Sequence, residues 1–135
     1  MATNTQSFLD YESVDYVPPD VMAVFGELAM GAGTTQREAA AGRFHSEALA
    51  APESWWHGLR DVVGFVGITA GACEVMVDHI GQVATKIGAK SGTSVDYFAA
   101  PRDVHDQPVI DFEAGRPAGA ATLKISQWLE ERFNA

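Results

Sequence analysis

Cysteine is nearly absent from this sequence of 135 residues, which contains Cys73 alone. A single thiol cannot form a disulfide within the chain, and it provides too few ligands for a structural zinc site. We therefore expect packing to supply the stability of the fold. A chain of this length is typical of one compact domain.

Basic residues are also scarce. Nine Lys and Arg against eighteen Asp and Glu give a formal net charge of −9. A surface this acidic repels phosphate backbones and anionic lipid headgroups, so we expect no nucleic-acid partner. The hydrophobic content of 47% is that of a globular protein rather than a disordered one.

Long apolar runs are missing as well. The longest, residues 62–77, is interrupted by three glycines and by Glu74. It is shorter than the roughly 20 apolar residues of a transmembrane helix, so we expect no membrane span. Residues 1–16 contain Asp10, Glu12 and Asp15 but no Lys or Arg, and therefore lack the pattern of a cleavable signal peptide.

The first predicted helix begins near Pro18-Pro19-Asp20, because proline and an acidic residue suit a first helical turn. Weakly apolar positions recur at helical spacing from Val21 to Leu49 and predict one long helix. Gly31-Ala32-Gly33 is its weak point, since each glycine costs roughly 1 kcal/mol relative to alanine. Ala50-Ala51-Pro52 ends this helix.

The clearest pattern is a set of apolar positions separated alternately by three and four residues. They are Leu59, Val62, Val66, Thr69, Cys73, Met76, Ile80, Val83 and Ile87. This spacing predicts a second long helix that packs lengthwise against another helix. A neighbouring stripe of small and charged residues, which includes Gly67, Gly71, Glu74 and Asp78, is expected to face outward. Its glycines are read as surface positions, with close approach of a second partner as the alternative.

These patterns together predict an all-α fold. Residues 1–16 would form an acidic arm, residues 17–100 an antiparallel helical hairpin, and residues 101–135 a loop followed by a short amphipathic helix. Pro101 and Pro108 indicate the loop, and apolar side chains between Leu123 and Phe133 indicate the helix at residues 120–133. Short strands around residues 109–112 remain an alternative.

Residues that could carry acid–base chemistry form only short-range pairs: His45 with Glu47, His57 with Asp61, and Asp78 with His79. Only His57 and Asp61 would share a helix face, and no companion motif completes a metal shell, so we expect no metal and no cofactor. Asp61 suits the positive end of a helix dipole. Cys73 is expected to be a packed side chain rather than a nucleophile. The sequence contains neither a glycine-rich phosphate loop nor a serine-centred nucleophile elbow.

The tripeptide Trp56-His57-Gly58 lies between the two predicted helices. A buried tryptophan can hold both helix ends together, and glycine can adopt the backbone of a tight reversal. A purely structural tryptophan is the alternative interpretation. The tripeptide has the form W-x-G at the expected bend of a hairpin.

With these features the chain resembles the small helical substrates of type VII secretion in actinobacteria, over roughly residues 17–103. The features are Val17-Pro18-Pro19-Asp20, the alanine-rich stretch to Ala51, the W-x-G bend, and a second helix leading towards Tyr97. The resemblance implies a protein exported without a cleavable signal peptide, which pairs as a homodimer or heterodimer of hairpins. In that family a Tyr is followed four residues later by Asp or Glu, whereas Pro101 follows Tyr97 at this spacing.

The sequence therefore predicts a non-enzymatic interaction protein, secreted or at the cell surface if the resemblance holds and cytoplasmic otherwise. The predicted partner-binding residues are Trp56, Gly58, Leu59, Val62, Val66, Cys73, Met76, Ile80, Val83, Ile87 and Tyr97. One alternative is a small all-helical enzyme or ligand-binding domain that uses His45, His57, Asp61 and His79. A viral structural protein or an immunity protein is a further alternative.

Overall fold

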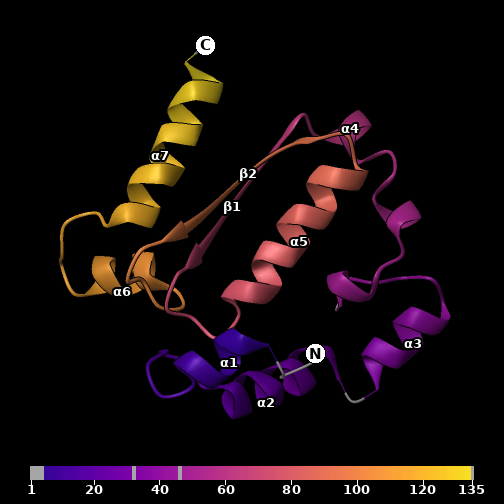
Figure 1. Cartoon of the computed structure of the whole chain (residues 1–135), viewed down its shortest axis with the longest axis horizontal. Helices are drawn as coiled ribbons and strands as arrows, with labels where there is room; N and C mark the ends of the chain where they lie inside the picture. Colours follow the sequence, from indigo (N-terminus) through magenta and orange to yellow (C-terminus); the bar gives the residue numbers. More distant parts are fainter. Residues whose placement is uncertain (1–4, 32, 46, 135) are drawn as a thin grey trace.

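The computed structural model describes residues 5–31, 33–45 and 47–134. Ala32 and Ser46, which fall within the first predicted helix, lie outside the described residues, as do residues 1–4 of the predicted arm. The elements in chain order are α1 (Gln6–Tyr11), α2 (Pro19–Met30), α3 (Thr34–Ala40), the 3-10 turns η1 (Ala48–Ala50) and η2 (Glu53–Trp56), α4 (Leu59–Val62), β1 (Phe65–Gly71), α5 (Val77–Lys90), β2 (Ser94–Ala100), α6 (Gln107–Glu113) and α7 (Ala120–Phe133) (Figure 1).

The strands β1 and β2 pair in parallel, from Phe65 opposite Ser94 to Gly71 opposite Ala100. Both strands contain β-branched and aromatic residues, which favour extended backbone. A parallel pair needs a long crossover connection, and α5 provides it. The central unit of the fold is therefore β1–α5–β2.

Helices cover both faces of this small sheet, with α5 on one side and α7 on the other (Figure 1). On the α5 face, Ile68 of β1 and Val83 of α5 pack against the cluster that contains the buried Ile87. On the α7 face, Trp128 lies over Gly67, and its indole Nε1 donates a hydrogen bond of 2.8 Å to Asp96 Oδ2 of β2. The result is three layers, helix on sheet on helix.

The prediction of an all-α hairpin is therefore wrong. The segment predicted as one helix from Leu59 to Ile87 contains α4, β1, a turn and the first part of α5. A parallel strand covered on both faces is apolar at nearly every position, so it satisfies a three-and-four spacing without being helical. Tyr97, expected after the second helix, lies in β2.

The prediction that the stripe with Gly67, Gly71 and Glu74 faces outward is also wrong. Glu74 is 3% exposed. A Cβ atom added at Gly67 would lie 2.6 Å from the Trp128 ring, and one at Gly71 would lie 2.5 Å from the Asp103 carbonyl oxygen. These two glycines therefore permit other parts of the same chain to approach the β1 backbone closely, rather than a second partner.

Predictions from local signals fare better. Helix α2 begins at Pro19, as predicted, and it ends before Gly31 and Gly33, whose φ angles of 76° and 71° are left-handed. The predicted single helix is therefore divided into α2 and α3 at its weak point. The predicted C-terminal helix is confirmed as α7.

The region from residue 101 to 119, predicted as a loop with short strands as the alternative, contains the helix α6. Pro108 lies in the first turn of α6, where a missing N–H costs nothing, so this proline begins a helix instead of ending one. In the part of the chain that is described, no helix has both the length and the apolar character needed to cross a membrane.

Candidate functional site

Two loops meet where the parallel strands end. Residues 72–76 follow β1 and residues 101–106 follow β2, so both loops lie at the carboxyl edge of the sheet, where α/β proteins carry their ligand sites. The backbone N–H of Ala72 donates to the Ala100 carbonyl and that of Cys73 donates to the Asp103 carbonyl, each at 2.9 Å. The loops are thus in direct contact.

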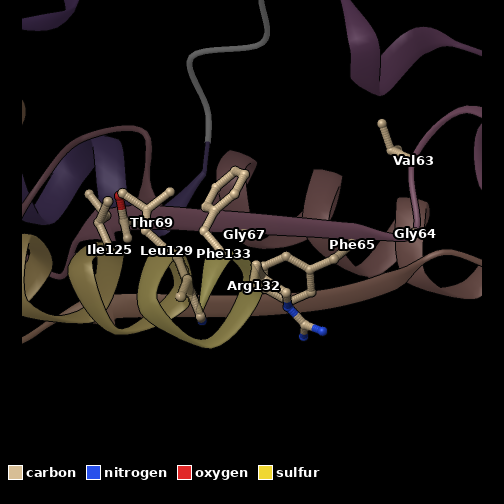
Figure 2. A pocket seen from close by; sticks show the side chains of 10 residues that line it. Val63, Gly64, Phe65, Gly67, Thr69, Ile125, Leu129, Arg132 and Phe133 are labelled. Atoms are coloured by element: carbon tan, nitrogen blue, oxygen red, sulfur yellow. The ribbon is translucent and has the colours of Figure 1, made fainter. Parts of the chain in front are cut away.

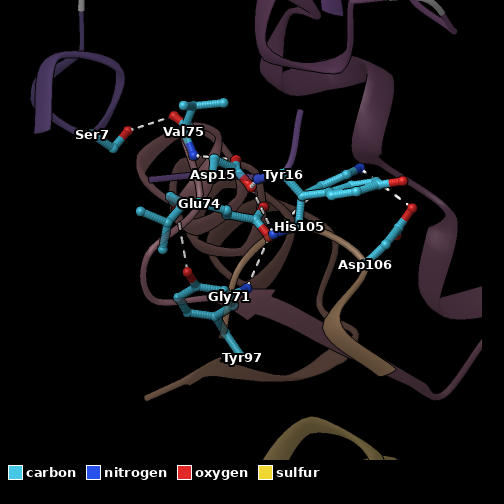
Figure 3. A network of polar contacts seen from close by, with 10 residues as sticks. Ser7, Asp15, Tyr16, Gly71, Glu74, Val75, Tyr97, His105 and Asp106 are labelled. Atoms are coloured by element: carbon cyan, nitrogen blue, oxygen red, sulfur yellow. Dashed lines mark hydrogen bonds and ion pairs between the residues drawn. The ribbon is translucent and has the colours of Figure 1, made fainter. Parts of the chain in front are cut away.

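Glu74 and His105 face each other across these loops (Figure 3). Glu74 Oε2 accepts the N–H of Gly71 at 2.9 Å and lies 3.8 Å from His105 Nδ1. Glu74 Oε1 is buried and has no hydrogen-bond partner among the described residues. The Glu74 side chain is 4% exposed and that of His105 is 27% exposed. We refer to these two residues as the Glu74–His105 pair.

Burial raises the pKa of Glu74 above its ordinary value. The Gly71 N–H and the His105 imidazole act in the opposite direction, while the charges of Asp15 and Asp106 add to the rise. A buried carboxyl with a raised pKa beside an imidazole, at the carboxyl edge of a parallel sheet, is typical of a functional site.

The backbone on either side of His105 adopts an uncommon conformation. Arg102 and Asp106 have φ angles of 66° and 55°, in the left-handed region that side chains disfavour. Such residues concentrate at functional sites, where the surrounding structure holds them. On the solvent side, Asp106 Oδ2 lies 3.7 Å from His105 Nε2, and the Asp106 side chain is 65% exposed.

The arrangement suits general acid–base catalysis. The Glu74 carboxylate next to Nδ1 favours the tautomer with the proton on that nitrogen, whereas the Asp106 carboxylate next to Nε2 favours the other. Because Glu74 is buried and Asp106 is exposed to water, the charge of Glu74 is screened less, so we expect the proton on Nδ1 and the lone pair on Nε2. The separation of 3.8 Å between Glu74 Oε2 and His105 Nδ1 is longer than a hydrogen bond. Catalytic hydrogen bonds are often this long before substrate binds and tighten in the complex.

Tyr97 of β2 lies next to this site. Its hydroxyl donates to the Val77 carbonyl at 3.3 Å. Burial raises the pKa of the Tyr97 phenol, and the charges of Glu74 and Asp78 raise it further. Tyr97 therefore stays protonated at neutral pH and acts as a hydrogen-bond donor.

Several residues predicted to bind a partner lie inside this chain's own core. Trp56 and Ile87 are buried together in one cluster, against which Leu59 and Val83 pack. Gly58 has a φ of 83° and forms the turn into α4. The others are spread over several elements: Val62 at the exposed end of α4, Val66 in β1, Cys73 and Met76 in the turn after β1, and Ile80 in α5. Partner binding by these residues stays a prediction.

The residues of the predicted alternative enzyme site have separate surroundings. His45 lies edge-on to Trp55, with ring centroids 5.7 Å apart, whereas His79 is buried against Phe8. His57 and Asp61 are exposed. The described residues include no group of three or more His, Cys, Asp or Glu that could hold a metal ion.

Glu74 and His105 were missed because Glu74 was assigned to an outward helix face and His105 to a loop. The available signal was a pair of short apolar runs, residues 65–71 and 97–100, each followed within a few residues by a titratable side chain. Interpreted as two strands joined by a helix, these runs place both side chains at one sheet edge.

The pKa of Glu74 leads to a prediction about stability. Since its pKa is higher in the folded chain, stability should fall as pH rises from the unfolded value near 4.5 through the folded value, and remain lower above it. Glu74→Gln removes this penalty. In urea unfolding between pH 4 and pH 8, the free energy of unfolding of the variant should rise relative to that of the wild type as pH rises. The expected gain is about 1.4 kcal/mol for each unit by which the fold raises the pKa of Glu74. A difference that shrinks with pH would contradict the buried position of the carboxylate.

A groove of about 830 Å³ runs along β1 and α7, away from the two loops (Figure 2). Its lining is mostly apolar and includes Phe65, Trp128, Leu129 and Phe133. Arg132 is the one charged residue of the lining, and its guanidinium stacks 4.3 Å from the Phe65 ring centroid. The groove therefore contains no general base.

The chain matches no protein-family model, no curated protein and no solved structure. Its function therefore has to be inferred from the chemistry of the Glu74–His105 pair and from the strands that position it.

Proposed function

We propose that Glu74 and His105 are the acid and the general base of a hydrolase that acts on carboxylic esters, with water as the attacking nucleophile. The observation that supports this most is the 3.8 Å approach of the buried Glu74 Oε2 to His105 Nδ1 at the carboxyl ends of two parallel strands. In α/β-hydrolases the acid precedes the histidine in the chain. Glu74 follows β1 and His105 follows β2, which is the same order.

The proposed mechanism uses the exposed side of the imidazole. His105 Nε2 accepts a proton from water as the water oxygen attacks the ester carbonyl, and it later donates that proton to the alkoxide that leaves when the ester C–O bond breaks. The imidazolium that forms in between is stabilised by the Glu74 carboxylate. Because Glu74 is buried, its charge acts on the imidazolium with little screening by water.

In α/β-hydrolases the nucleophile is a serine on a G-x-S-x-G turn that precedes the acid. The 135 residues contain no such motif. The proposal therefore assigns the acid and the base to Glu74 and His105, and takes water as the nucleophile.

The role of the pair can be tested in this chain. In ¹⁵N-edited NMR spectra, neutral His105 should be protonated on Nδ1 in the wild type and on Nε2 in Glu74→Gln, as expected when an orienting carboxylate is lost. His105 should also catalyse the hydrolysis of p-nitrophenyl acetate, because its Nε2 can accept a proton from the attacking water. His105→Gln should lower the rate of p-nitrophenol release about tenfold, less than the 10²- to 10⁴-fold effect of a fully assembled general base.

His57→Gln is the matched control, because His57 is an exposed imidazole outside the site. It should leave the His105 tautomer unchanged and lower p-nitrophenol release much less than His105→Gln does. If His105 is protonated on Nε2 in the wild type, or if both glutamine variants lose the same rate, the proposed role of the pair is wrong.

Export through type VII secretion stays a prediction. It depends on a helical hairpin, whereas the described residues from 65 to 100 form β1, α5 and β2. No contact or surface among the described residues favours that function over catalysis by the Glu74–His105 pair.

A further inference from the structure

The N-terminal arm, defined here as residues 5–16, is docked on the loop that carries Glu74 (Figure 3). Ser7 Oγ donates to the Val75 carbonyl at 2.8 Å, and the Ser7 N–H donates to Asp78 Oδ2 at 2.9 Å. Phe8 is 3% exposed and lies edge-on to His79 of α5, with ring centroids 5.4 Å apart. The arm is thus an integral part of the fold.

The last part of this arm joins the two loops of the site. Asp15 Oδ2 accepts the backbone N–H of Val75 at 2.8 Å, and Asp15 Oδ1 accepts the backbone N–H of His105 at 2.9 Å (Figure 3). Val75 directly follows Glu74 in the chain. One carboxylate therefore bonds to the backbone at both members of the Glu74–His105 pair.

Hydrogen bonds to a charged acceptor are about twice as strong as those between neutral groups. The two that Asp15 accepts are short, whereas the Glu74–His105 approach of 3.8 Å is too long to hold the loops together by itself. A catalytic pair needs its geometry held to within about 0.5 Å by surrounding groups. The two loops are already joined where the Cys73 N–H donates to the Asp103 carbonyl, and Asp15 adds a second bridge directly at the residues of the pair.

We propose that Asp15 is the positioning residue of the Glu74–His105 pair. Its carboxylate holds the backbone at Val75 and at His105 relative to each other, and thereby keeps the Glu74 carboxylate next to His105 Nδ1. Asp15 contacts backbone N–H groups rather than the imidazole ring, so it acts through the loops. This inference rests on the proposed function, because it concerns the geometry of the same pair.

Asp15→Asn in the full chain tests the inference. An asparagine side chain has one carbonyl oxygen in place of two carboxylate oxygens, so it cannot accept both N–H groups in this geometry. Hydrogen exchange at the amides of Val75 and His105 should accelerate about tenfold or more, as expected when a protecting bond is lost. The fraction of neutral His105 protonated on Nδ1 should fall, and p-nitrophenol release should fall with it.

Two controls separate positioning from stability and from the net charge of the chain. Ser7→Ala removes another bond between the arm and the 72–76 loop but leaves the bridge intact, so it should lower the melting temperature without changing the His105 tautomer. Asp10→Asn removes the same charge from an exposed position of α1 and should change neither quantity.

The outcomes are distinguishable. If the wild type lacks the Nδ1-protonated tautomer, the proposed function itself is wrong. If the wild type has it and folded Asp15→Asn retains both the tautomer and the rate, only the positioning role of Asp15 is overturned. If Ser7→Ala lowers the Nδ1-protonated fraction as much as Asp15→Asn does, the arm contributes general stability and Asp15 has no special role.

Discussion

Replacing Gly71 with alanine is expected to lower the free energy of unfolding by about 3 kcal/mol, at the upper end of the cost of overpacking. The new Cβ atom would lie 2.5 Å from the Asp103 carbonyl oxygen and 2.6 Å from that of Val104. These neighbours are backbone atoms, which cannot rotate away as the end of a side chain can. The loop that carries His105 must therefore move away from β1.

The same substitution should disturb the Glu74–His105 pair, because the Gly71 N–H is the hydrogen-bond donor to Glu74 Oε2. Denaturant unfolding would measure the stability, and the tautomer of His105 would report on the pair. Gly88→Ala is the control, since its Cβ would make an ordinary contact of 3.7 Å with Val95 and alanine is favoured in the α5 helix by about 1 kcal/mol. Equal stability of the two variants would show that the loops are not in contact at Gly71.

Trp128→Ala is expected to cost about 3–5 kcal/mol, the usual range for removing a buried tryptophan. Trp128 is 7% exposed and connects α7 to the sheet in three ways. Its ring lies over Gly67, its edge faces the Phe65 ring at a centroid distance of 6.0 Å, and its Nε1 donates to Asp96 Oδ2. Without the Trp128 side chain, the face of the sheet that packs against α7 loses these three contacts.

Leu129→Ala is the matched control, because Leu129 is the next residue of α7 and is 52% exposed. Its truncation should cost well under half as much, since about half of this residue is already exposed to water. Both losses can be measured by urea unfolding followed by circular dichroism. If the two variants are equally stable, α7 does not pack on the sheet through Trp128.

The sheet was missed for a physical reason. Residues 65–71 form a parallel strand with a helix on each face, so apolar and small side chains occupy almost every position. A run of this kind fits the spacing of a helix and that of a strand equally well. The pattern continues from Met76 to Ile87, a segment that does lie largely in α5, and the two parts together therefore resemble one long helix. Glycines at residues 64, 67 and 71 were the contrary signal, because helices disfavour them.

The site was missed for a related reason. Glu74 and His105 lie far apart in the sequence, and neither belongs to a recognisable motif. What brings them together is the register of β1 and β2, which aligns Gly71 with Ala100 and so places the two following loops side by side. Asp15 reaches both loops from a third segment.

Local chemistry was sufficient to determine some features of this protein from its sequence. The start of α2 at Pro19 and the extent of α7 depend on proline and on the spacing of nearby side chains, and the predicted weak point at Gly31 and Gly33 is where the single predicted helix is divided. The parallel pairing, the burial of Glu74 and its approach to His105 were decided only by the tertiary structure. These depend on contacts between segments distant in sequence, whose free energy becomes available only when the whole fold has formed.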